Sequence, residues 1–273
     1  MPLFLWRCIM LLAPAIPSLV LYEKIARNEL MKRALFLLYQ VYAWLIFLPV
    51  VIVLTALFST LTVIFATLVN PEWASAVFAV TWGKCIAYLT PVSVTVEGKQ
   101  NANREQSYVV VSNHQSQYDI FLIYGWLELD LKWVMKKELR KIPGIGIGCE
   151  KAGHIFIDRR NPKQARIAIR EALERVGEGV GILFFPEGTR SLDGRLLSFK
   201  KGAFRLAVEQ GLPILPVTLV GTRKVLPSRS LSLFPGPIKM VIHPAIDPAN
   251  KSVEELMEES RAAITSAMPP ELR

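Results

Sequence analysis

Cysteine and histidine are both scarce in this chain, with three of each among 273 residues. The cysteines Cys8, Cys85 and Cys149 are too few, and odd in number, for a disulfide framework. None has a CxxC partner or a histidine at metal-ligand spacing, which argues against a zinc site and for a reducing compartment. The sequence also contains no Gly-Lys-Ser/Thr phosphate loop and no GxSxG nucleophile elbow. Chemistry that needs either motif is therefore excluded.

Formal charge is absent from residues 34–69, a run of 36 residues. Hydrophobic residues make up 52% of the chain, too many for an ordinary soluble domain unless the excess lies in one segment. The net charge is +9, and residues 1–97 hold six basic and four acidic residues, which leaves +7 for the remainder. A basic globular part beside an apolar segment indicates an anionic partner, such as a phosphate group, a nucleic acid or a lipid surface.

The uncharged run predicts a membrane anchor. As one helix it would extend roughly 54 Å, well beyond a hydrocarbon core of about 30 Å. We therefore expect two helical arms, bent near Pro49 or near Ser59 and Thr60. Basic residues precede the run and a basic domain follows it, so both ends are predicted on the cytoplasmic side of the inner membrane.

Residues 3–22 form a second apolar stretch, interrupted by Arg7, Pro14 and Pro17. A cleaved signal peptide is the weaker interpretation, because a longer apolar block follows instead of a mature domain. Whether Met31 is the true start, and whether 1–30 belong to the native protein, stays open at this point.

Beyond residue 97 the pattern predicts an α/β domain, 98–273, after an N-terminal membrane-anchoring region, 1–97. Short β-rich segments alternate with amphipathic helices, which indicates a mixed, largely parallel sheet flanked by helices. Ser252 and Glu255 form a capping box before the last helix. The predicted strands are 92–96, 107–112, 154–157, 180–185, 214–220 and 238–242.

One histidine stands where catalysis is expected. His114 directly follows the apolar strand 107–112, and Asp119 opens a helical segment five residues later. Across one turn these side chains can form an imidazole–carboxylate pair, which fixes the ring tautomer and leaves the other nitrogen free to accept a proton. His154 and His243 lie at strand ends, where structural roles are expected.

A second polar cluster follows the strand 180–185. Glu187 and Arg190 stand in the sequence FPEGTR at 185–190, on the same predicted edge of the sheet as His114. An arginine there can bind a phosphate bidentately.

The third stretch is 136–159. A helix over 131–142, which includes its start, would have a basic arc beside an apolar arc, which suits an anionic membrane surface, although a solvated charged face is the commoner explanation. The basic arc is Lys136, Lys137, Arg140 and Lys141, and the apolar arc is Leu131, Met135, Leu139 and Ile142.

These blocks together resemble those of the glycerophosphate/lysophosphatidate acyltransferase family. NHQSQYD at 113–119 resembles the family's first block, Lys136 through GHIFIDR at 153–159 the second, FPEGTR at 185–190 the third and LPILPV at 212–217 the fourth. The resemblance covers about 92–222, and the apolar leader is similar to the family's membrane-embedded helices.

The resemblance implies transfer of an acyl group from acyl-CoA or an acyl-carrier protein to the sn-2 hydroxyl of 1-acyl-glycerol-3-phosphate. His114 would be the general base and Asp119 its partner, with no metal, no cofactor and no nucleic acid involved. The implied substrate-binding residues are Arg159, Glu187, Gly188, Thr189, Arg190 and Lys136. Acylation of another lysolipid, thioester hydrolysis, or an inactive membrane-tethered phospholipid-binding module are the alternatives.

Overall fold

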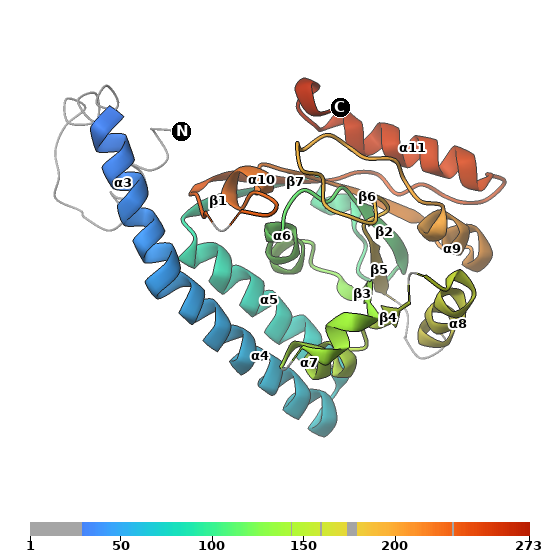
Figure 1. Ribbon diagram of the computed structural model, residues 1–273. Helices are drawn as coiled ribbons and strands as arrows, with labels where there is room; N and C mark the ends of the chain where they lie inside the picture. Colours follow the sequence, from blue (N-terminus) through green and yellow to red (C-terminus); the bar gives the residue numbers. More distant parts are fainter. Residues whose placement is uncertain (1–28, 143, 159, 174–178, 231) are drawn as a thin grey trace.

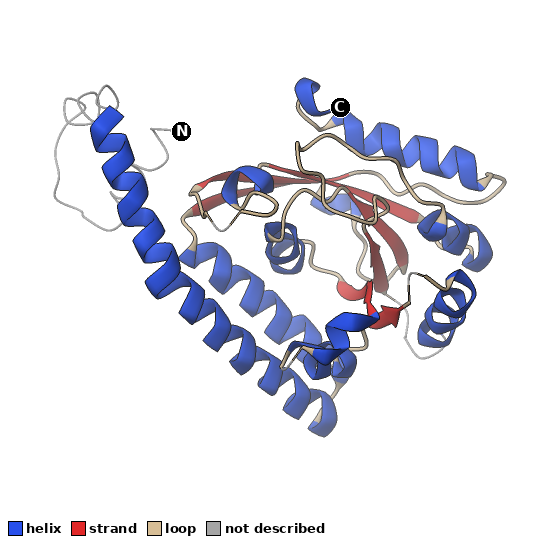
Figure 2. Cartoon of the chain, in the orientation of Figure 1, coloured by secondary structure: helices blue, strands red, loops and turns tan. Residues whose placement is uncertain are grey.

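The computed structural model describes residues 29–142, 144–158, 160–173, 179–230 and 232–273. Within these ranges seven segments pair into one sheet in the order β1-β7-β6-β2-β5-β3-β4. All neighbouring strands run parallel except β6 and β7, so the predicted mixed, largely parallel sheet is confirmed (Figure 2). The strands are β1 (Val92–Glu97), β2 (Tyr108–Ser112), β3 (Asp130–Lys136), β4 (Ile155–Ile157), β5 (Val180–Phe184), β6 (Ile214–Val220) and β7 (Gly236–Ile242).

Helices cover both faces of this sheet, because the central strands β2, β5 and β6 are buried on both sides. One core cluster joins the sheet to Leu122 and Ile123 of α6, and the other joins it to Phe204 of α9 and Leu256 of α11. The capping box at the start of α11 is present. The helical segments after β1 are η2 (Lys99–Asn101), α6 (Tyr118–Trp126), η3 (Lys137–Lys141), α7 (Ile145–Lys151), α8 (Pro162–Leu173), α9 (Gly202–Gln210), α10 (Thr222–Val225), α11 (Val253–Ser266) and η4 (Pro270–Leu272).

The helix predicted over 131–142 is wrong. Residues up to Lys136 form β3, an inner strand between β5 and β4, and only η3 is helical, as a short 3-10 turn. Lys132, inside this stretch, has a charged side chain that suggests a solvent-exposed position, but it is only 2% exposed. Its ammonium is bound by Asp130 at 2.9 Å and by the Ala152 carbonyl at 3.1 Å, so a charge that looked solvated is paired inside the protein.

The bend expected inside the apolar run is also wrong. One continuous helix runs through α3 (Glu29–Tyr42), the π-helical turn η1 (Ala43–Phe47) and α4 (Leu48–Leu68). The chain reverses only afterwards, at Asn70, whose side chain caps α5 (Pro71–Leu89) by accepting from the Trp73 N–H at 2.9 Å. Figure 1 shows α4 and α5 side by side as a helical hairpin against the body of the protein. The segment Arg33–Leu68 is long and apolar enough to cross a membrane.

The helices α3, α4 and α5 are each joined to the α/β body, α3 through Gln40. Gln40 binds the backbone of Leu233 through both its amide atoms, at 2.7 and 3.1 Å. Ser59 on α4 donates to the carbonyl of Gly144, just before α7. Gly83 on α5 packs against the backbone of α6. The sheet itself begins at β1, before the predicted domain boundary at residue 98.

Gly83 tests how closely the hairpin must approach the body. A Cβ at this position would lie 2.8 Å from the Phe121 oxygen and 3.0 Å from the Gly125 nitrogen, both backbone atoms. Gly83→Ala should therefore lower the free energy of unfolding by about 1–3 kcal/mol. Gly202→Ala is the control, because nothing lies within 4 Å of the added carbon, and it should be neutral or stabilising. Denaturant titration in detergent measures both, and equal stability of the two variants would contradict the close packing.

Candidate active site

The turn after β2 is held by its polar side chains. Asn113 is fully buried; its amide donates to the Leu219 carbonyl at 2.9 Å and accepts from the Leu219 N–H at 2.8 Å. The Ser116 hydroxyl donates to the Leu226 carbonyl at 2.6 Å. These bonds attach the turn to β6 and to the segment after α10. The residue between them, His114, is therefore carried on a rigid support.

His114 and Asp119 form the pair that their spacing predicts. Nδ1 of His114 lies 2.8 Å from Oδ2 of Asp119, and the carboxylate is fully buried. The same oxygen accepts the backbone N–H groups of Gln115 and Ser116, at 2.8 and 2.9 Å. Because this oxygen only accepts, His114 donates through Nδ1–H and keeps Nε2 free to take a proton.

Phe185 fixes the plane of the imidazole. Its ring stacks on His114 with centroids 3.8 Å apart and an interplanar angle of 12°. Phe185 follows β5, the strand beside β2, so the parallel register brings the two rings to the same edge of the sheet. The sequence pattern placed this residue in a strand and gave no sign of the stacking.

Glu187 acts beneath the site and does not line the cavity beside His114. It is 4% exposed, and its two oxygens accept the backbone N–H groups of His114 at 2.7 Å and Leu197 at 2.9 Å. Burial raises the pKa of this carboxyl group to about 7, although the two N–H donors favour the ionised form. Glu187 was predicted to bind substrate; its geometry is that of a positioning residue.

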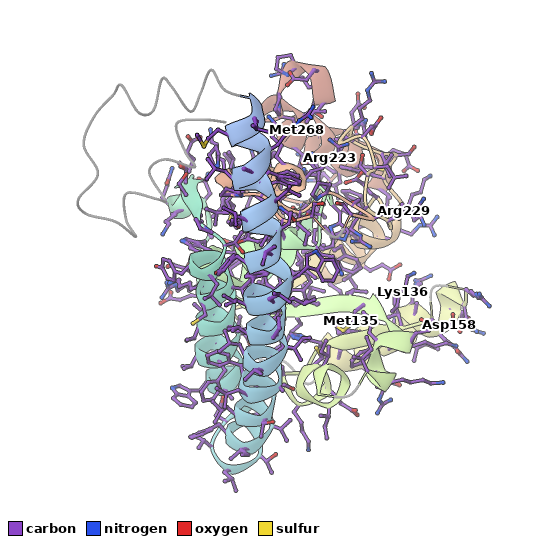
Figure 3. The ribbon with its side chains drawn as sticks, turned by 60° about the vertical axis from the view of Figure 1, so that its left-hand side comes forward. Met135, Lys136, Asp158, Arg223, Arg229 and Met268 are labelled. Carbon is purple, nitrogen blue, oxygen red and sulfur yellow. The ribbon has the colours of Figure 1, made fainter. Side chains whose placement is uncertain are left out.

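A cavity of about 530 Å³ adjoins His114. Gly188, Thr189 and Arg190 line one side of it, and Lys136 lines it from the exposed end of β3. Figure 3 shows Lys136 close to Asp158, which follows the neighbouring strand β4. Arg159, the other predicted phosphate ligand, lies outside the described residues. The structure therefore brings four of the predicted binding residues to one cavity.

The rest of the cavity wall is mostly apolar and comes from elements far away in the sequence. Helices α4 and α5 contribute four residues each, and the others come from β3, α6, η3, α7 and the segments that adjoin them. Sequence reasoning assigned α4 to the membrane and missed its place at the site. The apolar residues of this wall include Phe58, Phe78, Ala79, Trp82, Ile120, Trp133, Val134, Leu139, Ile142 and Ile145.

Cys149 and His154 line the same cavity as His114, and His243 lies outside it, but none of the three forms a pair with a carboxylate like that of His114 among the described residues. Burial raises the pKa of the Cys149 thiol to about 11, so it is protonated at neutral pH and a poor nucleophile. His154 is bound by the Tyr124 hydroxyl at 2.6 Å, and burial lowers its pKa to about 3. His243 is buried against the Thr218 hydroxyl at 2.8 Å. Structural roles fit all three, as expected.

Comparison with known proteins gives a consistent result. The sequence model of a family described as Acyltransferase matches residues 93–220. A 1-acyl-sn-glycerol-3-phosphate acyltransferase of Chlamydomonas reinhardtii is 38% identical over 66% of this chain and 54% of its own length. The alpha enzyme of Homo sapiens with the same name is 38% identical over 49% of this chain and 48% of its own. The crystal structure of the 1-acyl-sn-glycerophosphate (LPA) acyltransferase PlsC of Thermotoga maritima superposes with a TM-score of 0.73 at 32% identity, covering 86% of this chain and 95% of that one.

The fold is thus a mixed, largely parallel α/β sheet with a His–Asp pair at the end of one strand and an arginine-bearing turn at the end of the next. The chain belongs to the acyltransferase family, among relatives named 1-acyl-sn-glycerol-3-phosphate acyltransferases. It spans about half the length of the curated relatives it matches.

The raised pKa of Glu187 predicts a pH dependence of stability. A carboxyl whose pKa is higher in the folded state than the ordinary 4.5 stabilises the fold below about 4.5 and loses that contribution as pH rises to about 7. The free energy of unfolding of the wild type minus that of Glu187→Gln should therefore fall by up to roughly 3 kcal/mol as pH rises over this window.

Glu254→Gln is the matched control, because its pair with Lys201 lowers the Glu254 pKa. The stabilising contribution of Glu254 is present above pH 4.5 and is lost as pH falls. The free energy of unfolding of the wild type minus that of Glu254→Gln should therefore change with pH in the opposite direction. Denaturant unfolding at several pH values measures both differences. A pH-independent difference for Glu187→Gln would show that the pKa of Glu187 is the same in the folded and unfolded states.

Proposed function

We propose that this protein is an O-acyltransferase that moves a fatty acyl group from an acyl thioester to the sn-2 hydroxyl of 1-acyl-glycerol-3-phosphate, giving phosphatidate for phospholipid synthesis. The observation that carries the proposal is the His114–Asp119 pair beside a mostly apolar cavity whose rim bears Arg190 and Lys136. A base, a place for an alkyl chain and cations for a phosphate are the three things this reaction requires.

In the proposed reaction the acceptor hydroxyl attacks the carbonyl carbon of the thioester. Nε2 of His114 takes the hydroxyl proton as the C–O bond forms, a contribution of roughly 10²–10⁴-fold. Asp119 stabilises the resulting imidazolium through Nδ1–H. The tetrahedral intermediate then expels the thiolate, which receives the proton from His114, and the base is restored. No cofactor enters this sequence, and Cys149 stays outside it.

Arg190 and Lys136 are proposed to bind the phosphate of the acceptor. Both line the cavity, and a guanidinium and an ammonium group suit a phosphate dianion. Thr189 offers a hydroxyl on the same rim, and Gly188 shapes the turn. Arg159 completes the proposed set. The donor is a thioester of CoA or of an acyl-carrier protein, whose chain would occupy the apolar part of the cavity.

The hairpin is proposed to hold the protein in the cytoplasmic leaflet of the inner membrane. Leu57, Leu68 and Trp73 on α4 and α5 are 48%, 77% and 47% exposed, which suits lipid and not water. Both helices also pack on the body, α4 at α7 and α5 at α6, so neither is free to stand alone across a bilayer. Exposed basic residues of η3 lie beside α7 and would contact anionic lipid.

The catalytic assignment is tested by substitution. His114→Ala should lower kcat by about 10²–10⁴-fold, and Asp119→Asn should also lose most of the rate because the imidazole tautomer is no longer fixed. One measurement is phosphatidate formation from labelled acyl-CoA and lysophosphatidate. The other is thioester cleavage with and without lysophosphatidate. Cys149→Ser should retain most of its activity. Near-normal turnover by His114→Ala would refute the assignment, and thioester cleavage that ignores the acceptor would indicate a thioesterase.

Membrane topology is tested by labelling. With Cys8, Cys85 and Cys149 replaced by serine, single cysteines are introduced as Asn28→Cys and Gln100→Cys. Because the helical hairpin returns to the side from which it enters, both should resist an impermeant thiol reagent in intact spheroplasts and react after permeabilisation. Reaction of only one site in intact cells would establish a single crossing and overturn the one-leaflet arrangement.

A further inference from the structure

A segment that carries no predicted motif is bound to the FPEGTR turn. Residues 196–200 lie between this turn and α9. The Leu197 N–H donates to Glu187 at 2.9 Å, and the Lys200 N–H donates to the Pro186 carbonyl at 2.8 Å. The segment is thus fixed to the turn at both ends, and the side chain of Lys200 is delivered to it from a defined backbone position.

The side chain of Lys200 lies directly on Gly188. Gly188 has a φ of +73°, and a Cβ there would lie 2.7 Å from Nζ of Lys200, 2.9 Å from Cε and 3.2 Å from Cδ. A larger residue at 188 would therefore be strained and would also displace the ammonium. The glycine of the turn has a second purpose besides its backbone conformation, which is to let this lysine approach.

The charge of Lys200 is not paired with a carboxylate among the described residues. Its neighbour Lys201 pairs with Glu254, whereas among the described residues no carboxylate lies within ion-pair distance of the Lys200 ammonium. The turn that it covers continues into Arg190, and Gly188, Thr189 and Arg190 all line the cavity. Lys200 is exposed and is not itself a lining residue, so its link to the cavity is its contact with Gly188.

We propose that Lys200 is a substrate-binding residue, which contacts the phosphate of the acceptor together with Arg190. This inference rests on the proposed function and adds to it a residue from outside the family blocks. Arg190 presents a planar fork to the phosphate oxygens, while Lys200 supplies a point charge from across Gly188. The ligand chemistry required is a phosphate monoester next to the hydroxyl that reacts.

Kinetics of adjacent lysines test the proposal. Lys200→Met should raise the KM for lysophosphatidate about tenfold, with kcat and the KM for acyl-CoA little changed. Lys201→Met removes the same charge one residue away and should behave as wild type. Arg190→Ala is the positive control, and Lys200→Arg should recover most of the affinity because it keeps a cation at this position. With 1-acylglycerol, which lacks the phosphate, Lys200→Met should match wild type.

Equal KM values for Lys200→Met and Lys201→Met would overturn the proposal. A joint loss of kcat and thermal stability that Lys200→Arg does not repair would also overturn it, since this indicates a structural role. Equilibrium binding of labelled lysophosphatidate in detergent micelles, with Lys200→Met or Lys201→Met added to His114→Ala, gives a readout independent of turnover. If Lys200→Met does not weaken binding in the His114→Ala background, the phosphate contact of Lys200 is refuted, even if the wild type forms phosphatidate. Weakened binding supports the phosphate contact, even if the wild type does not form phosphatidate. Failure of the Lys200 proposal can therefore be distinguished from failure of the proposed function.

Discussion

Two buried carboxylates determine how the site is built. A carboxylate away from water is costly unless donors surround it, and neither Asp119 nor Glu187 has a lysine or arginine within ion-pair distance among the described residues. Asp119 uses two backbone N–H groups and the imidazole, and Glu187 uses the N–H groups of His114 and Leu197. Glu187 therefore forces three loops to meet at one point. All three bonds of Asp119 go to Oδ2, whereas its Oδ1 is buried without a partner among the described residues. The position of the base follows from the donors that these two groups do hold.

The strands that the sequence predicted are those whose signal is local. The runs that became β2, β5 and β6 are mostly apolar and rich in β-branched residues, so burial on both faces could be read from composition alone. The strand β3 was missed because Lys132 and its charged flanks imitate a solvated helix. What makes it a strand is pairing with β5 and β4 and the carbonyl of Ala152, none of which is local.

The helical hairpin was misplaced for a related reason. Charge counting found the apolar run, and bilayer thickness then placed a bend inside it. The local signals at the reversal, Asn70 as a cap and Pro71 at the first helical position, were present in the sequence but lie just beyond that run. Strand-end reasoning did better at the site. It located His114, Asp119 and the 185–190 turn, because parallel strands bring their carboxyl ends together whatever surrounds them.

The cavity lay beyond any such reasoning, since one wall of it belongs to the helix that is also proposed to face lipid. Its hydroxyls show how α4 serves both environments. Thr55 and Thr62 donate to carbonyls one turn earlier on their own helix, at 2.7 and 2.8 Å, and Thr55 also accepts from the Trp82 indole at 3.0 Å. Polar atoms on the cavity side are thus satisfied without water, which leaves room for an alkyl chain. Because the same hairpin is apolar on its outer side, a chain drawn from the bilayer would pass between two surfaces of like character on its way to His114.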